Sequence, residues 1–323
     1  MNKFNSHMVS LDDVRAAHER TKRHVVHTPV VTSTTINGLT GCNLHFKCEN
    51  FQRVGAFKFR GALNTVSLLS DEEKKRGVVT HSSGNHAQAL ALAARLLGVK
   101  ATIVMPKNSP IVKVNATRGY GAEIVFCENN VKSRVETAQE LINTHGYTLV
   151  HPYNDERIIA GAGTAAFELI QDFGPFDSIF APVGGGGLLS GTSIVAKGLD
   201  PTIKVFGGEP ENADDAFRSL RDGKIYPSEK PNTIADGLRT NLGDITFGII
   251  QKNVDQIILV SETEIIEAMR LLWERMKLVV EPSGAVSLAA MIKISEELKG
   301  SKIGVIISGG NVDLENFFSQ YRE

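Results

Sequence analysis

The chain has 323 residues, 42% hydrophobic and 22% charged, which is ordinary for a globular protein of one or two domains. Its 35 basic and 36 acidic residues give a net charge of -1, which argues against partners such as nucleic acid or a membrane surface. Three cysteines without a CxxC spacing, and an N-terminus without an apolar signal core, favour a reducing, cytoplasmic location.

Strands and helices are expected to alternate along most of the chain. Ser10 opens a charged amphipathic stretch to about Val25, and Asp13 completes a capping-box pattern. The strands are expected at 78–81, 101–105, 123–127, 178–183, 204–208, 256–260 and 302–307, and the helices at 87–97, 110–118, 133–145, after 187, near 262–276 and near 283–298. This alternation predicts an α/β fold with parallel sheets covered by helices on both faces.

The segment 54–62 places Lys58 between Phe57 and Phe59, with a glycine on either side. An amine that is partly removed from water has a lowered pKa and is more nucleophilic, which suits Schiff-base chemistry with a carbonyl. A lysine between aromatic residues is also commonly a surface residue whose stem covers apolar side chains. The segment alone leaves both interpretations open.

Two clusters lie where a predicted strand meets a predicted helix. The segment 81–88 contains Ser82-Ser83-Gly84-Asn85-His86, and its backbone N–H groups suit a carboxylate; alternatively, Ser83 or Asn85 only caps the helix. The four glycines Gly184, Gly185, Gly186 and Gly187 can surround a phosphate or form a flexible turn. They have neither the GxGxxG spacing of a dinucleotide site nor the sequence of a P-loop.

Two more segments offer ligand chemistry. Ser308 follows the last strand, where ligands bind in open α/β sheets, and it can bond a ring nitrogen or be a plain turn residue. Residues 209–215 include four acids, which suit a hard cation such as Mg²⁺ or Ca²⁺ or form the acidic first turn of a helix.

One lysine, a carboxylate loop and a glycine run on α/β architecture suggest a pyridoxal phosphate (PLP) enzyme. The chain resembles the fold type II family of PLP-dependent enzymes, most closely its serine racemases and serine/threonine dehydratases. Five motifs match in order and spacing: 56–62, 82–86, 184–187, 281–284 and 308–311. The resemblance implies two domains, each an open, mostly parallel twisted sheet with helices on both faces, as in the tryptophan synthase β chain. The large PLP-binding domain would comprise 1–75 and 154–323, and the small substrate-loop domain 76–153.

The resemblance also implies a role for each matched residue. Lys58 would form the Schiff base with PLP and act as the base on one face of the substrate Cα. The remaining cofactor contacts would be Phe57 and Gly237 on the two sides of the ring, Gly184 to Gly187 at the phosphate, Asn85 at the phenolic oxygen, Ser308 at the pyridine nitrogen, and Glu281. The substrate would contact Ser83, Asn85, His86, Arg134 and Thr240.

Ser83 distinguishes between activities, since dehydratases of the liver serine type have alanine at this place. A hydroxyl that faces Lys58 across the Cα would provide a second acid/base group and allow inversion, whereas Lys58 alone supports elimination. The resemblance therefore implies a serine racemase, converting L-serine to D-serine, with β-elimination of serine or threonine to a 2-oxo acid and ammonia.

Two alternatives remain open. Arg134 matches an arginine near the substrate side chain and could grip a second carboxylate, as a 3-hydroxyaspartate or threonine dehydratase with little racemisation would require. A solvated helix residue explains Arg134 equally well. The alternative from another class is a non-catalytic regulator that binds PLP or a nucleotide, against which the intact Lys58, Ser83 and Ser308 speak.

The resemblance implies two further sites and a partner. Glu209, the carbonyl of Ala213 and Asp215 match the divalent-cation site of racemases, for Mg²⁺ or for Ca²⁺ or Mn²⁺. Residues matching an ATP site, with ATP as an allosteric activator at a homodimer interface, are Ser33, Thr34, Arg53, Gln88, Tyr120 and Asn311. Arg53 stands where some relatives have lysine. The expected partners are a small amino-acid substrate and a second copy of the chain, with no nucleic acid and no membrane.

Overall fold

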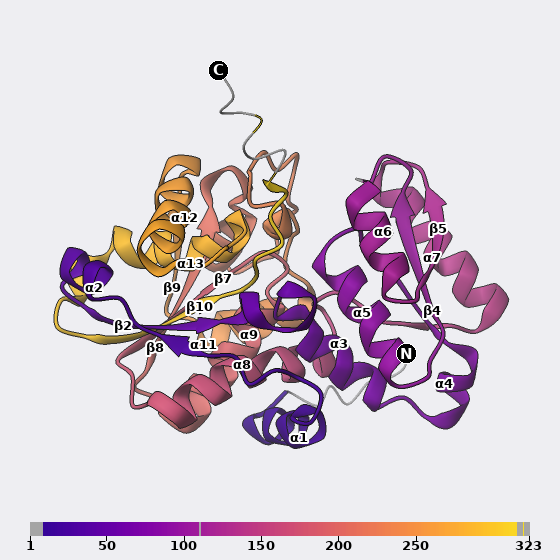
Figure 1. Cartoon of the computed structure of the whole chain (residues 1–323), viewed down its shortest axis with the longest axis horizontal. Coiled ribbons are helices and arrows are strands. Elements are labelled where there is room, and N and C mark those ends of the chain that lie inside the picture. Colours follow the sequence, from indigo (N-terminus) through magenta and orange to yellow (C-terminus); the bar gives the residue numbers. More distant parts are fainter. Residues whose placement is uncertain (1–8, 110, 315–318, 320–323) are drawn as a thin grey trace.

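The computed structural model describes residues 9–109, 111–314 and 319. Its strands form one sheet of six strands and one of four, and helices cover both, which confirms the predicted α/β fold (Figure 1). None of the described helices combines the length and the apolar character needed to cross a membrane.

The six-stranded sheet has the order β1-β2-β10-β7-β8-β9, and among its pairs only β1 with β2 is antiparallel. Its strands are β1 (Val30–Val31), β2 (Asn43–Cys48), β7 (Ser178–Pro182), β8 (Lys204–Pro210), β9 (Gln256–Val260) and β10 (Lys302–Ile307). One core packs it against α1 (Leu11–Thr21), α8 (Glu156–Phe173), α9 (Gly187–Leu199), α10 (Asp215–Asp222) and α11 (Asp244–Asn253). A second core packs it against α2 (Thr34–Thr40), α12 (Glu262–Met276) and α13 (Pro282–Lys293).

The four-stranded sheet is parallel, with the order β5-β4-β3-β6. Its strands are β3 (Val78–His81), β4 (Ala101–Pro106), β5 (Glu123–Cys127) and β6 (Thr148–Leu149). Alternate residues point to opposite faces, so Val78 packs in the core with α3 (Lys58–Ser67), α5 (Asn85–Leu96) and α6 (Ile111–Gly119), whereas Val79 packs towards α7 (Val131–His145). The short α4 (Asp71–Arg76) precedes β3. The domain limits at 76 and 153 stay a prediction.

Several helix ends differ from the sequence-based expectation. The capping box of Ser10 and Asp13 is present, but α1 ends at Thr21 and not near Val25. The run near 283–298 is interrupted, because α13 ends at Lys293 and a 3₁₀ segment follows it. The 3₁₀ segments are η1 (Glu49–Phe51), η2 (Arg53–Gly55), η3 (Glu211–Ala213), η4 (Asp236–Leu238) and η5 (Ser295–Leu298).

Candidate active site

Lys58 begins α3, next to the end of β10. The backbone N–H of Phe57 donates to the carbonyl oxygen of Ser308 over 3.0 Å, which ties the start of α3 to that strand end. The Lys58 ammonium donates to the carbonyl oxygen of Pro152 over 2.8 Å. Burial lowers the pKa of Lys58 from 10.5 to about 8, so far more neutral amine is present near neutral pH than in an ordinary lysine. A neutral amine is what Schiff-base chemistry requires.

The two phenylalanines beside Lys58 have different surroundings. Phe59 is fully buried in the core that α3 shares with α5 and the small sheet. Phe57 is half-buried, and Nζ of Lys58 lies 5.0 Å from the centre of its ring. Two flanking rings therefore do not desolvate the amine together: Phe59 is a core residue, and Phe57 alone is placed to pack against a bound ring.

The loop after β3 leads into α5 without a side-chain cap among the described residues. Gly84 is the N-cap residue and Asn85 already lies inside the helix, so the alternative that Ser83 or Asn85 only caps α5 is wrong. The Asn85 amide donates to Oε1 of Glu281 over 2.8 Å and accepts from the Asn311 amide over 2.9 Å. Ser83 is half-buried, and its hydroxyl has no hydrogen-bond partner in the described part of the chain.

The four glycines lie buried between β7 and α9, and the packing around them excludes side chains. A Cβ at Gly184 would lie 2.8 Å from Cα of Leu238, and one at Gly185 would lie 2.3 Å from the Tyr153 ring. Gly186 has a φ of 87°, a left-handed conformation that favours glycine, and no side chain caps α9. The first N–H groups of α9 are therefore available to an anion such as a phosphate.

Ser308, Glu281 and Gly237 meet around Ser283, which is part of the matched motif 281–284. The buried hydroxyl of Ser308 donates to the Ser283 carbonyl oxygen over 3.5 Å, and the N–H of Gly237 donates to the Ser283 hydroxyl over 3.0 Å. Burial, with the negative charge of Asp236 added to it, raises the pKa of Glu281 to about 7. Ser308 therefore provides a neutral hydroxyl here, and Glu281 provides a carboxyl group that is partly protonated near neutral pH.

The histidines of the site are uncharged near neutral pH. Burial, and then the charge of Lys58, lowers the pKa of His86 to about 3, and one ring nitrogen of His86 lies 3.1 Å from the Val150 carbonyl oxygen. Burial, and then the nearby His81, lowers the pKa of His151 to about 4. The Lys58 amine is thus surrounded by neutral imidazoles.

The segment 151–154, which was not predicted to belong to the site, lies directly against Lys58 and the glycines. Pro152 accepts from Lys58, and the Tyr153 ring covers Gly185. Nδ1 of His151 accepts from the backbone N–H of Asn154 over 2.9 Å, which leaves the ring proton on Nε2 when the imidazole is neutral. The strand before this segment, β6, has two residues and was not among the predicted strands, so the position of the segment at the carboxyl end of a parallel sheet became visible only in the structure.

Arg134 on α7 is half-buried rather than fully solvated. Its Nε is buried and has no hydrogen-bond partner among the described residues. Its charge contributes, after burial, to lowering the pKa of His81, so the guanidinium lies near the end of β3. Thr240 is exposed in the loop between η4 and α11. The structure therefore weakens the interpretation of Arg134 as a solvated helix residue.

The predicted cation site contains two buried carboxylates with no positive partner at hydrogen-bond distance. Glu209 accepts from the backbone N–H groups of Ala216 and Phe217 over 2.9 and 2.7 Å. Both carboxylate oxygens of Asp215 are buried and make no hydrogen bond of good geometry within the described chain; burial raises the pKa of Asp215 to about 6, although the nearby Ser228 hydroxyl and Arg218 act in the opposite direction. No group of three or more His, Cys, Asp or Glu side chains among the described residues could hold a metal, so a cation here would also need the Ala213 carbonyl.

The residues of the predicted ATP site do not converge within one chain. Ser33 and Thr34 lie at the start of α2, on the opposite side of the molecule from α5, which carries Gln88, and α6, which precedes Tyr120 (Figure 1). Asn311 lies at the start of α5, where its amide donates to Oδ1 of Asn85 over 2.9 Å and to the carbonyl oxygen of Val54 over 2.6 Å. Arg53 is exposed and donates to the His24 carbonyl oxygen.

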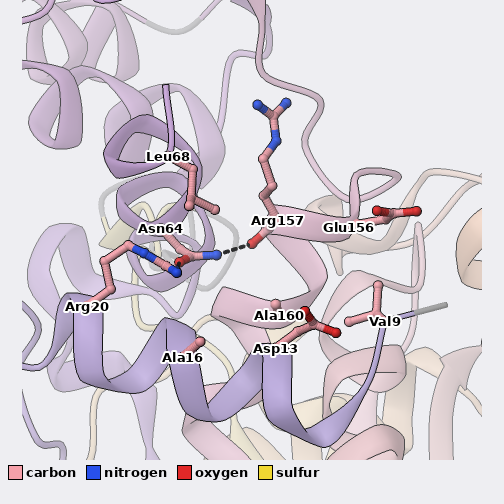
Figure 2. Close-up of a pocket in the computed structure, with 9 residues that line it drawn as sticks. All are labelled: Val9, Asp13, Ala16, Arg20, Asn64, Leu68, Glu156, Arg157 and Ala160. Atoms are coloured by element: carbon pink, nitrogen blue, oxygen red, sulfur yellow. Dashed lines mark hydrogen bonds between the residues drawn. The ribbon is translucent and has the colours of Figure 1, made fainter. Parts of the chain in front are cut away.

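A separate cavity of about 190 Å³ lies between α1, α3 and α8 (Figure 2). Its lining includes Arg20, Asn64 and Arg157, and none of the predicted site residues. Figure 2 shows the Asn64 amide bridging Arg20 on α1 and the backbone of Arg157 on α8. Because none of the predicted site residues lines it, this cavity is not the candidate active site.

Comparison with known proteins connects this geometry to a family. The family model described as pyridoxal-phosphate dependent enzyme matches residues 21–309. A serine racemase from Dictyostelium discoideum is 51% identical over 314 residues, covering 95% of this chain and 96% of that protein. An L-threo-3-hydroxyaspartate ammonia-lyase from Saccharomyces cerevisiae is 50% identical over 306 residues, covering 94% of each.

A solved structure agrees with these matches. The crystal structure of serine racemase from Dictyostelium discoideum aligns with a TM-score of 0.91 at 50% identity, covering 95% of this chain and 100% of that chain. The matched region includes Lys58, the four glycines and Ser308. The chain therefore belongs to the fold type II family of pyridoxal-phosphate-dependent enzymes, whose racemases and ammonia-lyases it resembles.

Proposed function

We propose that this chain interconverts L-serine and D-serine with PLP, and also eliminates water from serine or threonine to give a 2-oxo acid and ammonia. The observation that carries the proposal is the pKa-lowered amine of the half-buried Lys58, beside the end of β10 and the segment that covers the glycines. The similarity to serine racemases supports the same activity.

The residues around Lys58 fit PLP. The uncapped N–H groups at Gly184 to Gly187 would hold the phosphate, and the amine of Lys58 would bind the aldehyde carbon. Ser308 would bond the ring nitrogen, Asn85 the phenolic oxygen, and Phe57 and Gly237 would lie on the two sides of the ring, with Glu281 nearby. When bound, PLP withdraws electrons from the Cα of an amino acid and so makes its proton more acidic.

Lys58 and Ser83 are assigned to opposite faces of the substrate Cα. Lys58 removes the Cα proton on one face, and Ser83 gives a proton on the other, which inverts the centre. If the β-hydroxyl leaves as water first, the product loses ammonia by hydrolysis and a 2-oxo acid results. Since both outcomes follow the same proton removal, one enzyme is expected to show both.

A substrate panel tests the proposal. The holoenzyme is incubated with L-serine, D-serine, L-threonine and L-threo-3-hydroxyaspartate, and the products are separated by chiral chromatography and assayed for 2-oxo acid. We expect D-serine and pyruvate from L-serine. A PLP-loaded protein that converts none of the serine would refute the proposal.

A second candidate, a 3-hydroxyaspartate dehydratase, is favoured by the unpartnered Nε of Arg134. A planar guanidinium can bind a carboxylate with two hydrogen bonds, and hydroxyaspartate carries a second carboxylate. The similarity to an L-threo-3-hydroxyaspartate ammonia-lyase supports this candidate. Arg134→Met should then lower kcat/KM for hydroxyaspartate much more than for serine, whereas Arg118→Met, at an exposed arginine of α6, should change neither.

Glu209, the Ala213 carbonyl and Asp215 are proposed to bind Mg²⁺, or Ca²⁺ or Mn²⁺. The buried, unpartnered oxygens of Asp215 support a hard cation at this position. A cation at 100 times its Kd should stabilise the fold by about 2.7 kcal/mol. Thermal unfolding with Mg²⁺ and with EDTA measures this, and an equal Mg²⁺ effect in Asp215→Asn would contradict the assignment.

The proposal also includes a homodimer, ATP as an activator, and a cytoplasmic location. The start of α2, with Ser33 and Thr34, lies on the opposite side of the molecule from α6, which precedes Tyr120, so an ATP site that uses both would need two copies (Figure 1). Three buried free cysteines suit a reducing compartment. Sedimentation with and without ATP tests the assembly; a monomer that ATP activates would contradict a site shared between two chains.

The division into a large domain (1–75 and 154–323) and a small domain (76–153) is also proposed. The four strands of the four-stranded sheet all lie within 76–153. Lys113 on α6 pairs with Asp236 over 2.7 Å across the two parts. Hydrogen exchange should show one cooperative unit for each part, with substrate slowing exchange at this contact.

A further inference from the structure

A fully buried ion network lies behind α3, and the proposed chemistry does not use it. The Arg60 guanidinium donates through Nε to Oε2 of Glu49 over 2.7 Å and through Nη2 to Oε1 of Glu49 over 2.9 Å. The same guanidinium donates through Nη1 and Nη2 to the two oxygens of Glu168 over 2.7 and 2.8 Å. Arg60 is 0% exposed and therefore has two bidentate carboxylate partners without water.

Lys47 completes the network and balances its charge. Its ammonium donates to Oε2 of Glu168 over 2.7 Å and to the Thr28 carbonyl oxygen over 2.8 Å. The four side chains, Lys47, Glu49, Arg60 and Glu168, are each no more than 1% exposed and carry two positive and two negative charges. Burial alone would raise the pKa of Glu168, but Arg60 and Lys47 hold it at about 2.

The network joins four elements around the first turn of α3. Lys47 comes from β2, Glu49 from η1, Arg60 from α3 and Glu168 from α8. Buried ion pairs often contribute little to stability relative to apolar residues of the same volume, so their retention calls for another explanation. Fixed geometry is the property that bidentate charge pairs provide best.

The backbones of α3 and α8 also touch directly. A Cβ at Gly61 would lie 2.8 Å from the Ile158 carbonyl oxygen, and one at Gly161 would lie 2.7 Å from the Arg60 carbonyl oxygen. One helical turn after Arg60, the Asn64 amide donates to the Arg157 carbonyl oxygen over 2.7 Å (Figure 2). Sliding or rotation of α3 would break several of these contacts together.

A short backbone path connects the network to the site. The N–H of Arg60 donates to the Phe57 carbonyl oxygen over 2.9 Å, and the N–H of Phe57 donates to the Ser308 carbonyl oxygen over 3.0 Å. In the sequence, Lys58 lies between Phe57 and Arg60, whose backbones are joined by the first of these hydrogen bonds. A shift of the Arg60 backbone would therefore also move Lys58 and the end of β10.

We propose that Arg60 is a positioning residue: with Glu49 and Glu168 it fixes the first turn of α3, and so places the amine of the half-buried Lys58 against the Pro152 carbonyl oxygen. The inference rests on the proposed role of Lys58 as the amine that holds PLP. Arg60 itself is assigned no contact with substrate or cofactor.

The test reads the position of the amine through its titration in the full chain after PLP is removed. Reductive methylation of Lys58 by formaldehyde and cyanoborohydride proceeds through the neutral amine, and peptide mass spectrometry measures its extent at each pH. Burial is the cause of the low pKa of Lys58, about 8, so a displaced and hydrated amine must titrate at higher pH. An upward shift of one unit means about tenfold less neutral amine below the midpoint.

The decisive variant is Arg60→Met with Glu49→Gln, which leaves Lys47 and Glu168 as a neutral pair. We expect a folded protein whose Lys58 midpoint lies at least about half a unit above that of the parent. Arg60→Lys keeps the charge but loses the planar fork and should shift less. If the double variant does not fold, Arg60→Lys carries the same test.

The matched control is Lys197→Met with Asp255→Asn. It removes an ion pair, with 2.8 Å between Nζ and Oδ2, that does not involve α3. It should lower thermal stability and leave the Lys58 midpoint unchanged. A folded double variant with an unchanged midpoint, or an equal shift in the control, would overturn the proposal. Fixation of PLP to Lys58 by borohydride in the parent protein tests the proposed function separately, since it does not depend on Arg60.

Discussion

Lys58 and Arg60 are two residues apart on α3, and their side chains have contrasting surroundings. Two residues correspond to a rotation of about 200° around a helix, so the side chains leave on opposite sides. The Lys58 amine has one hydrogen bond in the described chain, to the Pro152 carbonyl oxygen, and its pKa is lowered. The Arg60 guanidinium bonds both oxygens of Glu49 and both of Glu168.

The contrast suggests that the two sides of α3 have separate tasks. A buried amine with few partners is costly for the fold, but it keeps the amine available for reaction. The hydrogen bonds of Arg60 to Glu49 and Glu168 fix the position of α3, and none of these charged groups is left available for reaction. Variants on the Lys58 side should therefore lose activity with little loss of stability, and variants on the Arg60 side should lose stability first.

The largest effect is expected at Lys58. Lys58→Ala should lower both racemisation and elimination by more than about 10³-fold, because it removes the nucleophile and one acid/base group. Stability should be kept or increased, because a buried ammonium is removed. Initial rates and thermal unfolding measure the two quantities, and a large loss of stability would break the contrast.

The single variant Arg60→Met should have the largest effect on stability. It leaves Glu49 and Glu168 buried against Lys47 alone, which should cost about 3–5 kcal/mol in the free energy of unfolding. Adding Glu49→Gln should recover part of this loss. Urea unfolding of both proteins measures the difference, and equal stability of Arg60→Met and the parent would remove the argument for the network.

Ser83→Ala should separate racemisation from elimination. Racemisation should fall by roughly 10²-fold or more, while elimination of L-serine is kept within about tenfold, because only the second acid/base group is lost. Undiminished D-serine formation in Ser83→Ala would show that another group acts on the second face.

The last effect concerns the pH dependence of stability and Glu281. Because its pKa in the fold is raised from 4.5 to about 7, its contribution to stability is complete below pH 4.5 and is lost as the pH rises through 7. The loss amounts to about 3 kcal/mol, at 1.36 kcal/mol for each pKa unit. Urea unfolding of the PLP-free protein should show this decline relative to Glu281→Gln, and parallel pH curves would contradict it.

The regular parts of the fold could be predicted from local patterns. The apolar strand before the glycine run and the capping box at Ser10 are short-range features, and both were confirmed. The strand β2 was missed because Lys47 and His45 interrupt its apolar pattern, and only the distant Glu168 explains a lysine that is fully buried there. The resemblance identified the family, which the comparisons confirmed.

The contacts within the site depend on partners far apart in the chain. Lys58 meets Pro152, and Arg60 meets Glu168, through pairings across 94 and 108 residues that no local motif encodes. Separate motifs can show that a lysine and a glycine run are present. They do not show which face of α3 each residue occupies, because helix rotation is fixed by packing such as that of Gly61 on α8.

The central claim is that Lys58 is the amine that holds PLP. The most direct measurement is borohydride reduction of the holoenzyme, followed by digestion and mass spectrometry. We expect a yellow protein that loses its visible band on reduction, with the pyridoxyl group on the peptide that contains Lys58. A protein that stays colourless after PLP is added, or a pyridoxyl group on another lysine, would contradict it.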